Sequence, residues 1–199
     1  MEFSELVARR RMVRNYDARP VPPDLVDRII DRARRAPSAG FAQGQCFVVV
    51  TAPEARAAIA ALADERSHVE RGFDPWLSNA PVHVVVCADQ RAYEARYSTR
   101  DKARTGVDPS SWPVPYALVD AGAALMLLLL AAVDEGLAAG FLGIHRLPGL
   151  SRLLAIPEGV EALGVATLGY PAADRRSSSL RAGWKPLDEV VHRDRWRER

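Results

Sequence analysis

Four arginines lie within six residues near the start of the chain, in the segment Arg9-Arg10-Arg11-Met12-Val13-Arg14. Guanidinium groups bind phosphate through paired, charge-assisted hydrogen bonds, so this cluster is suited to a phosphate-bearing ligand. A loop of small residues, Ala36-Pro37-Ser38-Ala39-Gly40, follows, and small residues let a flat ring approach the backbone. Spacing alone favours a simpler interpretation, a solvated basic face at the end of a helix. Only the order of the later segments favours the ligand site.

The size and composition of the chain are those of an ordinary globular protein. It has 199 residues, of which 48% are hydrophobic and 26% charged, and its formal net charge is +2. This length suits a single domain over residues 1–199, and the charge gives no reason to expect nucleic acid as a partner. The first residues lack the basic start and apolar stretch of a signal peptide, so we expect a cytoplasmic protein.

The expected elements mix helices and strands. Apolar spacing and proline placement predict helices over 5–13, 25–33, 53–63 and 150–154, and apolar runs predict strands over 46–50, 81–87 and 164–171. Residues 136–144 should form a helix end, a tight turn and a strand. We expect 90–114 to be a long irregular loop, and 67–79 to be a loop or broken helix with Phe73 and Trp76 exposed. No G-x-G-x-x-G follows the first strand, which argues against a Rossmann-type dinucleotide fold.

The most apolar segment of the chain, residues 121–133, contains four consecutive leucines and lies between Asp120 and Asp134. A helix needs about 20 residues to cross a bilayer, so this segment is too short to do so and we expect no membrane partner. It should instead be a helix buried on all sides, at the centre of a domain or of a dimer.

The cysteines and histidines predict no metal site. Cys46 and Cys87 each lie in or beside an apolar run, which favours buried thiols over a disulfide or a metal pair. His83 lies within a predicted strand and should be a core histidine. His145 follows a predicted strand, and we expect it to cap that strand rather than to donate a proton. The four histidines do not have the spacing of metal ligands.

Four segments, taken in order, resemble motifs of the nitroreductase superfamily of FMN-dependent oxidoreductases. Residues 10–14 are similar to its RRSxR flavin-phosphate motif, and residues 36–40 with Gln43 are similar to its APSxxNxQPW loop. Residues 120–143 resemble its buried dimer helix and the turn under the flavin ring. Residues 168–171 and 186–192 resemble its closing strand and C-terminal arm. The resemblance covers nearly the whole chain.

This resemblance implies an α+β fold in which helices surround a mixed central sheet, and an intertwined homodimer with FMN sites at the subunit interface. It implies an FMN-dependent enzyme that transfers hydride from NAD(P)H to a small electrophile by a ping-pong mechanism. Nitroaromatics, quinones and activated alkenes are the implied acceptors. The flavin carries the chemistry in such enzymes, so no catalytic side chain is expected.

The resemblance also implies the residues of the site. Those that would bind the cofactor are Arg10, Arg11, Met12, Arg14, Pro37, Ser38, Ala39, Gln43, Phe141, Leu142, Gly143 and Arg181, the second loop acting from the partner subunit. Backbone N–H groups of residues 140–143 would stabilise negative charge on the reduced flavin. Substrate would contact Phe41, Trp112 and Tyr116. An alternative for the aromatic residues is a hydrophobic patch that holds the loop on the core.

The chain departs from the family motifs at a few positions. Met12 replaces the serine of the first motif, and Phe41, Gly44 and Gln45 replace the asparagine, proline and tryptophan of the second. Arg181 is the nearest substitute for a basic pair near the C-terminus. These departures keep two alternatives open: a specialised flavin-dependent dehydrogenase of the same superfamily, and a flavin or deazaflavin binding and storage protein.

Overall fold

The computed structural model describes residues 2–173 and 178–198, and the first of these ranges contains one four-stranded sheet. Its strands are β1 (Gln45–Val50), β2 (Val82–Asp89), β3 (Ala138–Gly143) and β4 (Val160–Gly169), in the order β1-β2-β4-β3. Neighbouring strands are all antiparallel, so the expectation of a mixed sheet is wrong for the four strands, and the only parallel pairing among the described residues is an isolated bridge between Met12 and Ala139. The expected α+β class is confirmed.

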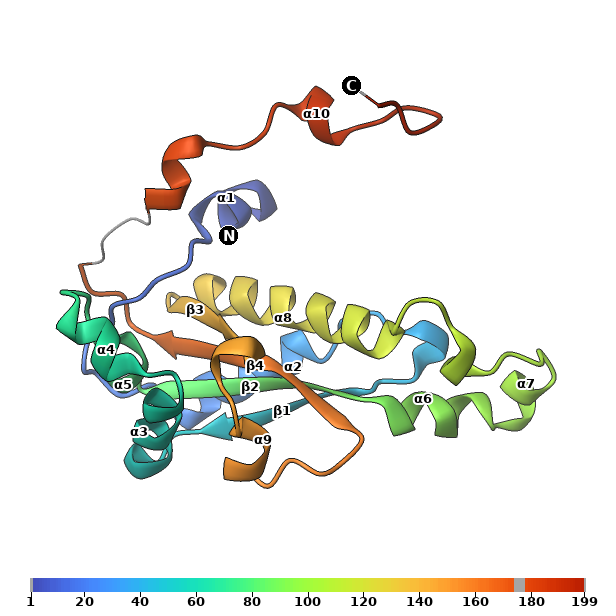
Figure 1. The fold of residues 1–199 in the computed structure, drawn as a ribbon, viewed down its shortest axis with the longest axis horizontal. Helices are drawn as coiled ribbons and strands as arrows, with labels where there is room; N and C mark the ends of the chain where they lie inside the picture. The colour runs from blue at the N-terminus through green and yellow to red at the C-terminus, as the bar shows by residue number, and fades with distance from the viewer. Residues whose placement is uncertain (1, 174–177, 199) are drawn as a thin grey trace.

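Helices cover both faces of the sheet (Figure 1). Helices α2 (Pro23–Ala33) and α8 (Tyr116–Asp134) pack on one face, and α3 (Pro53–Leu62) and α9 (Leu150–Leu153) pack on the other. Successive side chains of a strand point to opposite faces. Val84 of β2 therefore joins the core beneath α8, whereas Val85 joins the core beneath α3. Burial on both faces confirms β2 as a central strand.

The remaining helices are short. They are α1 (Phe3–Arg9), α4 (Glu65–Glu70), α5 (Trp76–Asn79), α6 (Gln90–Tyr97), α7 (Arg100–Ala103) and α10 (Leu187–Val190). Short 3-10 helices occupy Ala39–Phe41, Pro109–Ser111, Ile144–Arg146 and Ser178–Ala182. The expectation of an irregular loop over 90–114 is wrong, because α6 and α7 lie there. The carboxylate of Asp89 starts α6 by accepting a hydrogen bond from the Arg91 amide at 3.0 Å.

Helix α8 is longer and less buried than expected. It has 19 residues, and a window of 18 of them has a mean hydropathy of 2.2, so by length and composition it is able to cross a membrane, and the expectation that it is too short is wrong. In this fold it lies on the sheet, where Ala124 and Leu128 are completely buried. Its other face is open, with Val119 49% and Met126 46% exposed, so burial on all sides is also wrong for a single chain.

The first helix ends at Arg9 rather than at Val13. The Val13 amide donates to the carbonyl oxygen of Ala139 at 3.0 Å, and Arg10 already has extended backbone angles. Pairing with β3 thus replaces the helical hydrogen bonds, and the arginine segment is extended rather than helical. The expectation of a basic helix end is wrong for this reason.

Two side chains, Trp76 and Cys46, differ from expectation in their burial. Trp76 is buried because it packs with Leu77 and Tyr16 in a small core, although Phe73 is exposed as expected. Cys46 is exposed, whereas Cys87 is buried as expected. His145 lies in an exposed 3-10 turn after β3.

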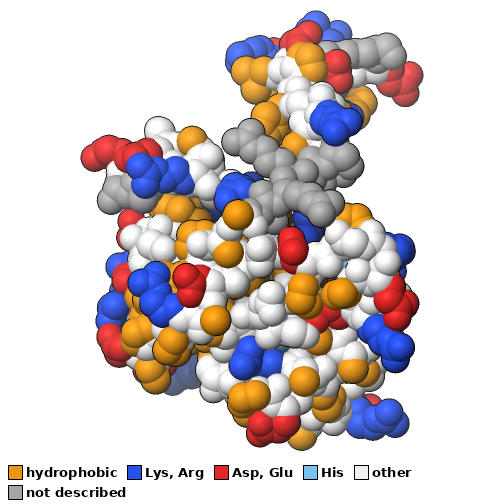
Figure 2. Space-filling view, turned by 90° about the vertical axis from the view of Figure 1, so that its left-hand side faces the viewer, with side chains coloured by type: hydrophobic (Ala, Val, Ile, Leu, Met, Phe, Trp, Pro, Cys, Tyr) orange, Lys and Arg blue, Asp and Glu red, His pale blue; other side chains and the backbone are white. Residues whose placement is uncertain are grey.

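Residues 178–198, the C-terminal arm, lead away from the sheet and carry α10 (Figure 1). Figure 2 shows hydrophobic and charged side chains of this arm set apart from the body. Its large apolar side chains are exposed: Leu180, Trp184, Leu187, Val190 and Trp196.

Candidate functional site

The arginine segment lies along β3. Besides the bridge at Met12, the carbonyl oxygen of Val13 passes so close to Gly140 that a Cβ there would lie only 2.5 Å from it. Glycine at 140 therefore lets the two backbones touch. The contact brings residues 10–14 and 138–143, two of the segments expected to bind cofactor, to one edge of the sheet.

The free edge of β3 presents backbone donors. Ala139 directs its carbonyl oxygen away from β4 and toward Val13. Backbone groups two residues apart in a strand point the same way, so the amides of Phe141 and Gly143 also point away from β4. The side chain of Leu142 packs into the core beneath α3. Amides aimed outward from an edge are suited to binding an electron-rich group.

Three arginine side chains come from the segment whose backbone pairs with this edge. Arg10 is half-buried, whereas Arg11 and Arg14 are exposed, and the Arg14 guanidinium lies 5.8 Å from the centre of the Trp76 ring. A hollow of about 140 Å³ adjoins the segment and is lined by Arg9, Arg11, Val13, Val133, Leu137, Ala138 and Pro171. The segment can therefore bind phosphate beside an apolar wall.

The Ser38 loop, residues 36–45, is anchored by hydrogen bonds. The Ala39 amide donates to Asp120 Oδ2 at 2.8 Å, and the Gln43 amide donates to Ser38 Oγ at 2.9 Å. The Arg96 guanidinium donates to the carbonyl oxygen of Gly40 at 2.7 Å. These bonds hold the loop in one conformation, with Pro37 and Gln43 exposed.

Asp120 joins this loop to the core. Its carboxylate is buried, and it also accepts a hydrogen bond from the Tyr93 hydroxyl at 2.5 Å. Burial, together with this hydrogen bond, raises the pKa of Tyr93, so its hydroxyl stays protonated and keeps donating. A buried carboxylate with two donors is costly to disturb.

Backbone strain occurs at the tip of the loop. Phe41 and Gln43 have φ angles of 58° and 54°, which are unfavourable for side chains larger than glycine. Gly40 is also left-handed, and a Cβ there would lie 2.8 Å from the Tyr97 ring. Phe41 is held 72% exposed on this strained tip. Strain of this kind is common at binding sites.

The aromatic residues pack edge to face. The Trp112 ring lies 5.0 Å from Tyr97, 5.3 Å from Tyr116 and 6.3 Å from Tyr93, centre to centre. Such contacts hold residues 109–116 on α6, as the alternative interpretation expects. Tyr116 is still 41% exposed, and contact with substrate stays a prediction.

The two parts of the expected site lie at opposite ends of α8. The Ser38 loop contacts Asp120 near its start, whereas the arginine segment and Val133 line one hollow near its end. About 20 Å of helix separates Asp120 from Val133. One chain therefore does not bring the Ser38 loop to its own arginine segment.

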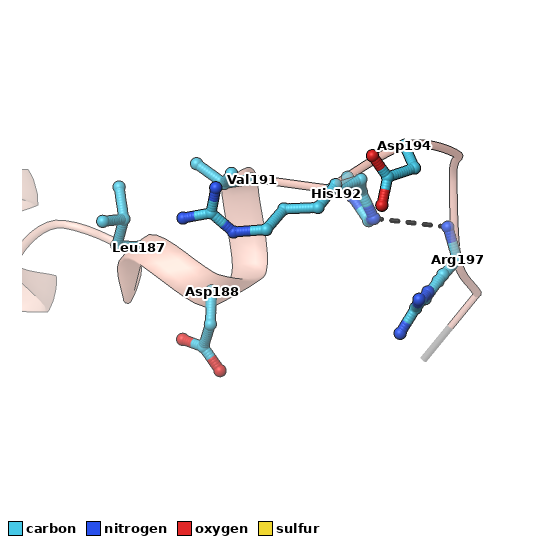
Figure 3. A pocket seen from close by; sticks show the side chains of 7 residues that line it. Leu187, Asp188, Val191, His192, Asp194 and Arg197 are labelled. Carbon is cyan, nitrogen blue, oxygen red and sulfur yellow. Dashed lines mark hydrogen bonds between the residues drawn. The ribbon is translucent and has the colours of Figure 1, made fainter.

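Arg181, the remaining residue expected to bind cofactor, lies exposed in the C-terminal arm. The arm contains an open hollow of about 600 Å³ (Figure 3), where the Arg197 amide donates to His192 Nδ1 at 3.3 Å. Its walls are Leu187, Asp188, Val191, His192, Arg193, Asp194 and Arg197. Because all of them come from the arm, this hollow is separate from the β3 edge.

Comparison with known proteins identifies the family. The nitroreductase family matches residues 7–170. The chain belongs to the nitroreductase family. A Thermus thermophilus protein named NADH dehydrogenase is 38% identical over 92% of this chain and 91% of its own length. A Bacillus subtilis protein named FMN reductase (NAD(P)H) is 30% identical over 92% of this chain and 70% of its own.

The solved structures agree on the fold of this nitroreductase-family chain. The structure of NfrA2 from B. megaterium superposes with a TM-score of 0.78 at 23% identity, covering 98% of this chain and 74% of that one. At this identity the likeness concerns the fold.

Three residues that anchor the site were not expected from the sequence: Asp120, Tyr93 and Arg96. The position of Asp120 could have indicated a specific role, because it is a charged residue beside the most apolar segment of the chain. Tyr93 and Arg96 lie in a region expected to be irregular, so nothing in their spacing pointed to the Ser38 loop.

Proposed function

We propose that this chain is an FMN-dependent oxidoreductase that transfers hydride from NAD(P)H to a small electrophilic acceptor. The observation that carries the proposal is the extended arginine segment, which pairs with β3 at Ala139 and so lies next to the outward amides of Phe141 and Gly143. Family membership and the FMN reductase among its relatives support FMN and NAD(P)H. We place the enzyme in the cytoplasm, with α8 packed on the sheet of a soluble fold.

The residues present fit FMN. Arg10, Arg11 and Arg14 would hold its phosphate and ribityl chain next to Met12, and the outward amides at Phe141 and Gly143 would face its ring. When bound, FMN supplies the ability to accept and return hydride. The chain itself binds and orients it, and the amides favour its electron-rich form.

A homodimer would complete this site. The Ser38 loop of a second copy, with Pro37, Ser38, Ala39 and Gln43, would reach the flavin that the loop in the same chain does not reach. The exposed face of α8, with Val119 and Met126, supplies apolar surface for such a dimer. The arm with Arg181 and its exposed apolar residues would pack on the second copy.

The acceptor would bind beside the second copy's Ser38 loop. Phe41 on the strained tip, with Trp112 and Tyr116 behind it, would form an aromatic wall. Flat nitroaromatics and quinones fit such a wall by stacking, and activated alkenes by apolar contact.

The first test is the absorbance spectrum of the purified protein, before and after anaerobic addition of NADPH and then of NADH. We expect a flavin band that bleaches promptly with one of them and returns when a quinone is added. A flavin band that persists with both nucleotides contradicts the reductase and supports storage.

The second test concerns the phosphate site. We expect Arg10→Ala with Arg14→Ala to weaken FMN binding by about tenfold or more, which is about 1.4 kcal/mol. Arg66→Ala is the matched control, because Arg66 is 91% exposed on α4 and pairs with Glu70. Loss of less than about threefold, roughly 0.7 kcal/mol, would show that the phosphate binds elsewhere.

A further inference from the structure

Two cysteines 41 positions apart in the chain face each other across the sheet. Cys46 in β1 is the register partner of Cys87 in β2, and the two strands are antiparallel. Directly opposite residues place their side chains on the same face of a sheet. Both thiols therefore lie on the face opposite α8, away from the β3 edge and from the open face of α8.

The backbone distance suits a disulfide. The Asp89 amide donates to the carbonyl oxygen of Gly44 at 2.7 Å, so residues 44 and 89 form a hydrogen-bonded pair. Hydrogen-bonded and non-hydrogen-bonded pairs alternate along the ladder, so Cys46 and Cys87 also form a hydrogen-bonded pair, with Cα atoms about 5.5 Å apart. Cα atoms in disulfides are about 4.4–6.8 Å apart, so the backbone separation is within reach of a disulfide. Side chains of a hydrogen-bonded pair lie farther apart than the Cβ atoms of a relaxed disulfide, so the bond would be strained and easily reduced.

The two thiols differ in access and in acidity. Cys87 is completely buried, whereas Cys46 is exposed. The neighbouring Cys87 thiol lowers the pKa of the Cys46 thiol, and the Arg91 charge acts in the same direction, against burial and Asp89. The neighbouring Cys46 thiol and burial raise the pKa of Cys87, whose thiol donates to the Val85 carbonyl oxygen at 3.9 Å. Cys46 is therefore the thiol that becomes a thiolate and meets reagents from solution.

We propose that Cys46 and Cys87 form a reversible dithiol–disulfide pair that reacts with peroxides, with Cys46 as the attacking thiol and Cys87 as the resolving thiol. The Cys46 thiolate attacks one oxygen of hydrogen peroxide, which breaks the O–O bond and leaves a sulfenic acid and hydroxide. The Cys87 sulfur then attacks the Cys46 sulfur, the S–O bond breaks, and water leaves with the proton of Cys87. One peroxide is reduced to two waters while two thiols become one disulfide.

The two cysteines lie next to the Ser38 loop and to α6, the two elements that position the proposed substrate site. Cys46 comes directly after the Ser38 loop, and α6, which holds that loop through Arg96, begins after β2. The disulfide would fix the ends of β1 and β2 at this point. The dithiol chemistry itself does not depend on the proposed oxidoreductase activity.

The test is oxidation of the full-length protein by hydrogen peroxide, followed by thiol counting after unfolding and by intact mass. We expect both thiols to disappear together, with a loss in mass of two hydrogen atoms, and to return with dithiothreitol. Peptide mapping of the wild-type protein should find the segment containing Cys46 linked to the segment containing Cys87. This measurement needs no variant to fold.

Two variants separate the roles. Cys87→Ser should stop at a sulfenic acid on Cys46 that dimedone traps, and Cys46→Ser should slow oxidation of Cys87 by about tenfold or more. Addition of oxygen to Cys46 while Cys87 remains a thiol would overturn the proposal, as would a disulfide between two chains through Cys46. Because the readouts are thiols and mass, failure here leaves the proposed FMN function unaffected.

Discussion

The body of the molecule and its C-terminal arm differ in how far they bury their large apolar side chains. Leu128 in α8 is completely buried, whereas Trp184 in the arm is 90% exposed. The body buries a large apolar core on both faces of its sheet, whereas the large apolar side chains of the described part of the arm are exposed. Burying an apolar side chain of this size is worth about 1.5–3 kcal/mol. We propose that the arm packs on the surface of a second copy.

Helix α8 contains the same contrast within one element. Ala124 and Leu128 face the sheet, and Met126 lies on the open face between them. Apolar residues on all sides of a helix indicate cover on all sides. The sequence expectation of complete burial is wrong for the single chain, and the proposed dimer would restore it.

Leu128→Ala should have the largest effect, since it removes a completely buried side chain. We expect a loss of about 2–5 kcal/mol in the free energy of unfolding. Met126→Ala on the open face is the control. It should lower the free energy of unfolding only at protein concentrations at which a second copy covers Met126. Urea unfolding at two protein concentrations measures both. Equal losses at low concentration would remove the contrast between the two faces.

The pH dependence of stability should come next in size. His83 is buried in β2, its Nε2–H donates to the Leu77 carbonyl oxygen, and burial lowers its pKa from 6.5 to about 4, helped by the Arg56 charge. Below pH 6.5 the imidazole of His83 therefore binds a proton in the unfolded chain but stays neutral in the folded chain. The contribution of His83 to the free energy of unfolding is fully present above pH 6.5. It falls by about 3 kcal/mol as the pH drops to 4.

Urea unfolding from pH 7.5 to 4.5 checks the effect of His83, with His83→Gln as the comparison. The variant should lose less stability over this range, because glutamine does not titrate. Parallel curves for the two proteins would show that other groups, and not this core histidine, cause the decline.

Asp120→Ala should cost about 2–3 kcal/mol, because it leaves the Ala39 amide and the Tyr93 hydroxyl without their acceptor. Asp120→Asn keeps one acceptor oxygen and should cost less. Thermal unfolding measures the stability of the body, and the rate of hydrogen exchange at the Ala39 amide measures local opening of the Ser38 loop. If exchange at Ala39 stayed slow in Asp120→Ala, the loop would be held by other contacts.

Trp184→Ala should have the smallest effect on the body. We expect unchanged helical content and a dimer weaker by about tenfold, or about 1.4 kcal/mol. Sedimentation across a range of concentrations measures the association, and circular dichroism measures the fold. If the monomeric Trp184→Ala variant unfolded at a lower temperature than the monomeric wild-type protein, Trp184 would pack on its own chain. The arm and the body would then not differ in how they bury apolar side chains.

Local pattern predicted most of the elements. The apolar spacing of 25–33 located α2, the proline at 53 located the start of α3, and the run at 81–87 located the central strand. Errors occurred where a distant partner decides the local conformation. Residues 10–13 leave the helix because β3 offers them backbone hydrogen bonds, and α6 forms where the spacing of 90–97 is only weakly amphipathic.

For the site, the arginine segment, the Ser38 loop and residues 141–143 were named from the sequence, and their roles remain proposals. Nothing local could show that the first and third of these share a sheet edge while the second lies at the far end of α8. Long-range contacts carry no periodicity that a single sequence displays.

The sequence alone determined the family motifs, the class of the fold and the most apolar helix, because these depend on residue type and on spacing along the chain. Only the tertiary structure decided which groups meet. It set Asp120 against Ala39 and Tyr93, and it paired Cys46 with Cys87, which look like two unrelated buried thiols in the sequence. The reason is register: a shift of one residue between β1 and β2 would turn the two thiols to opposite faces of the sheet.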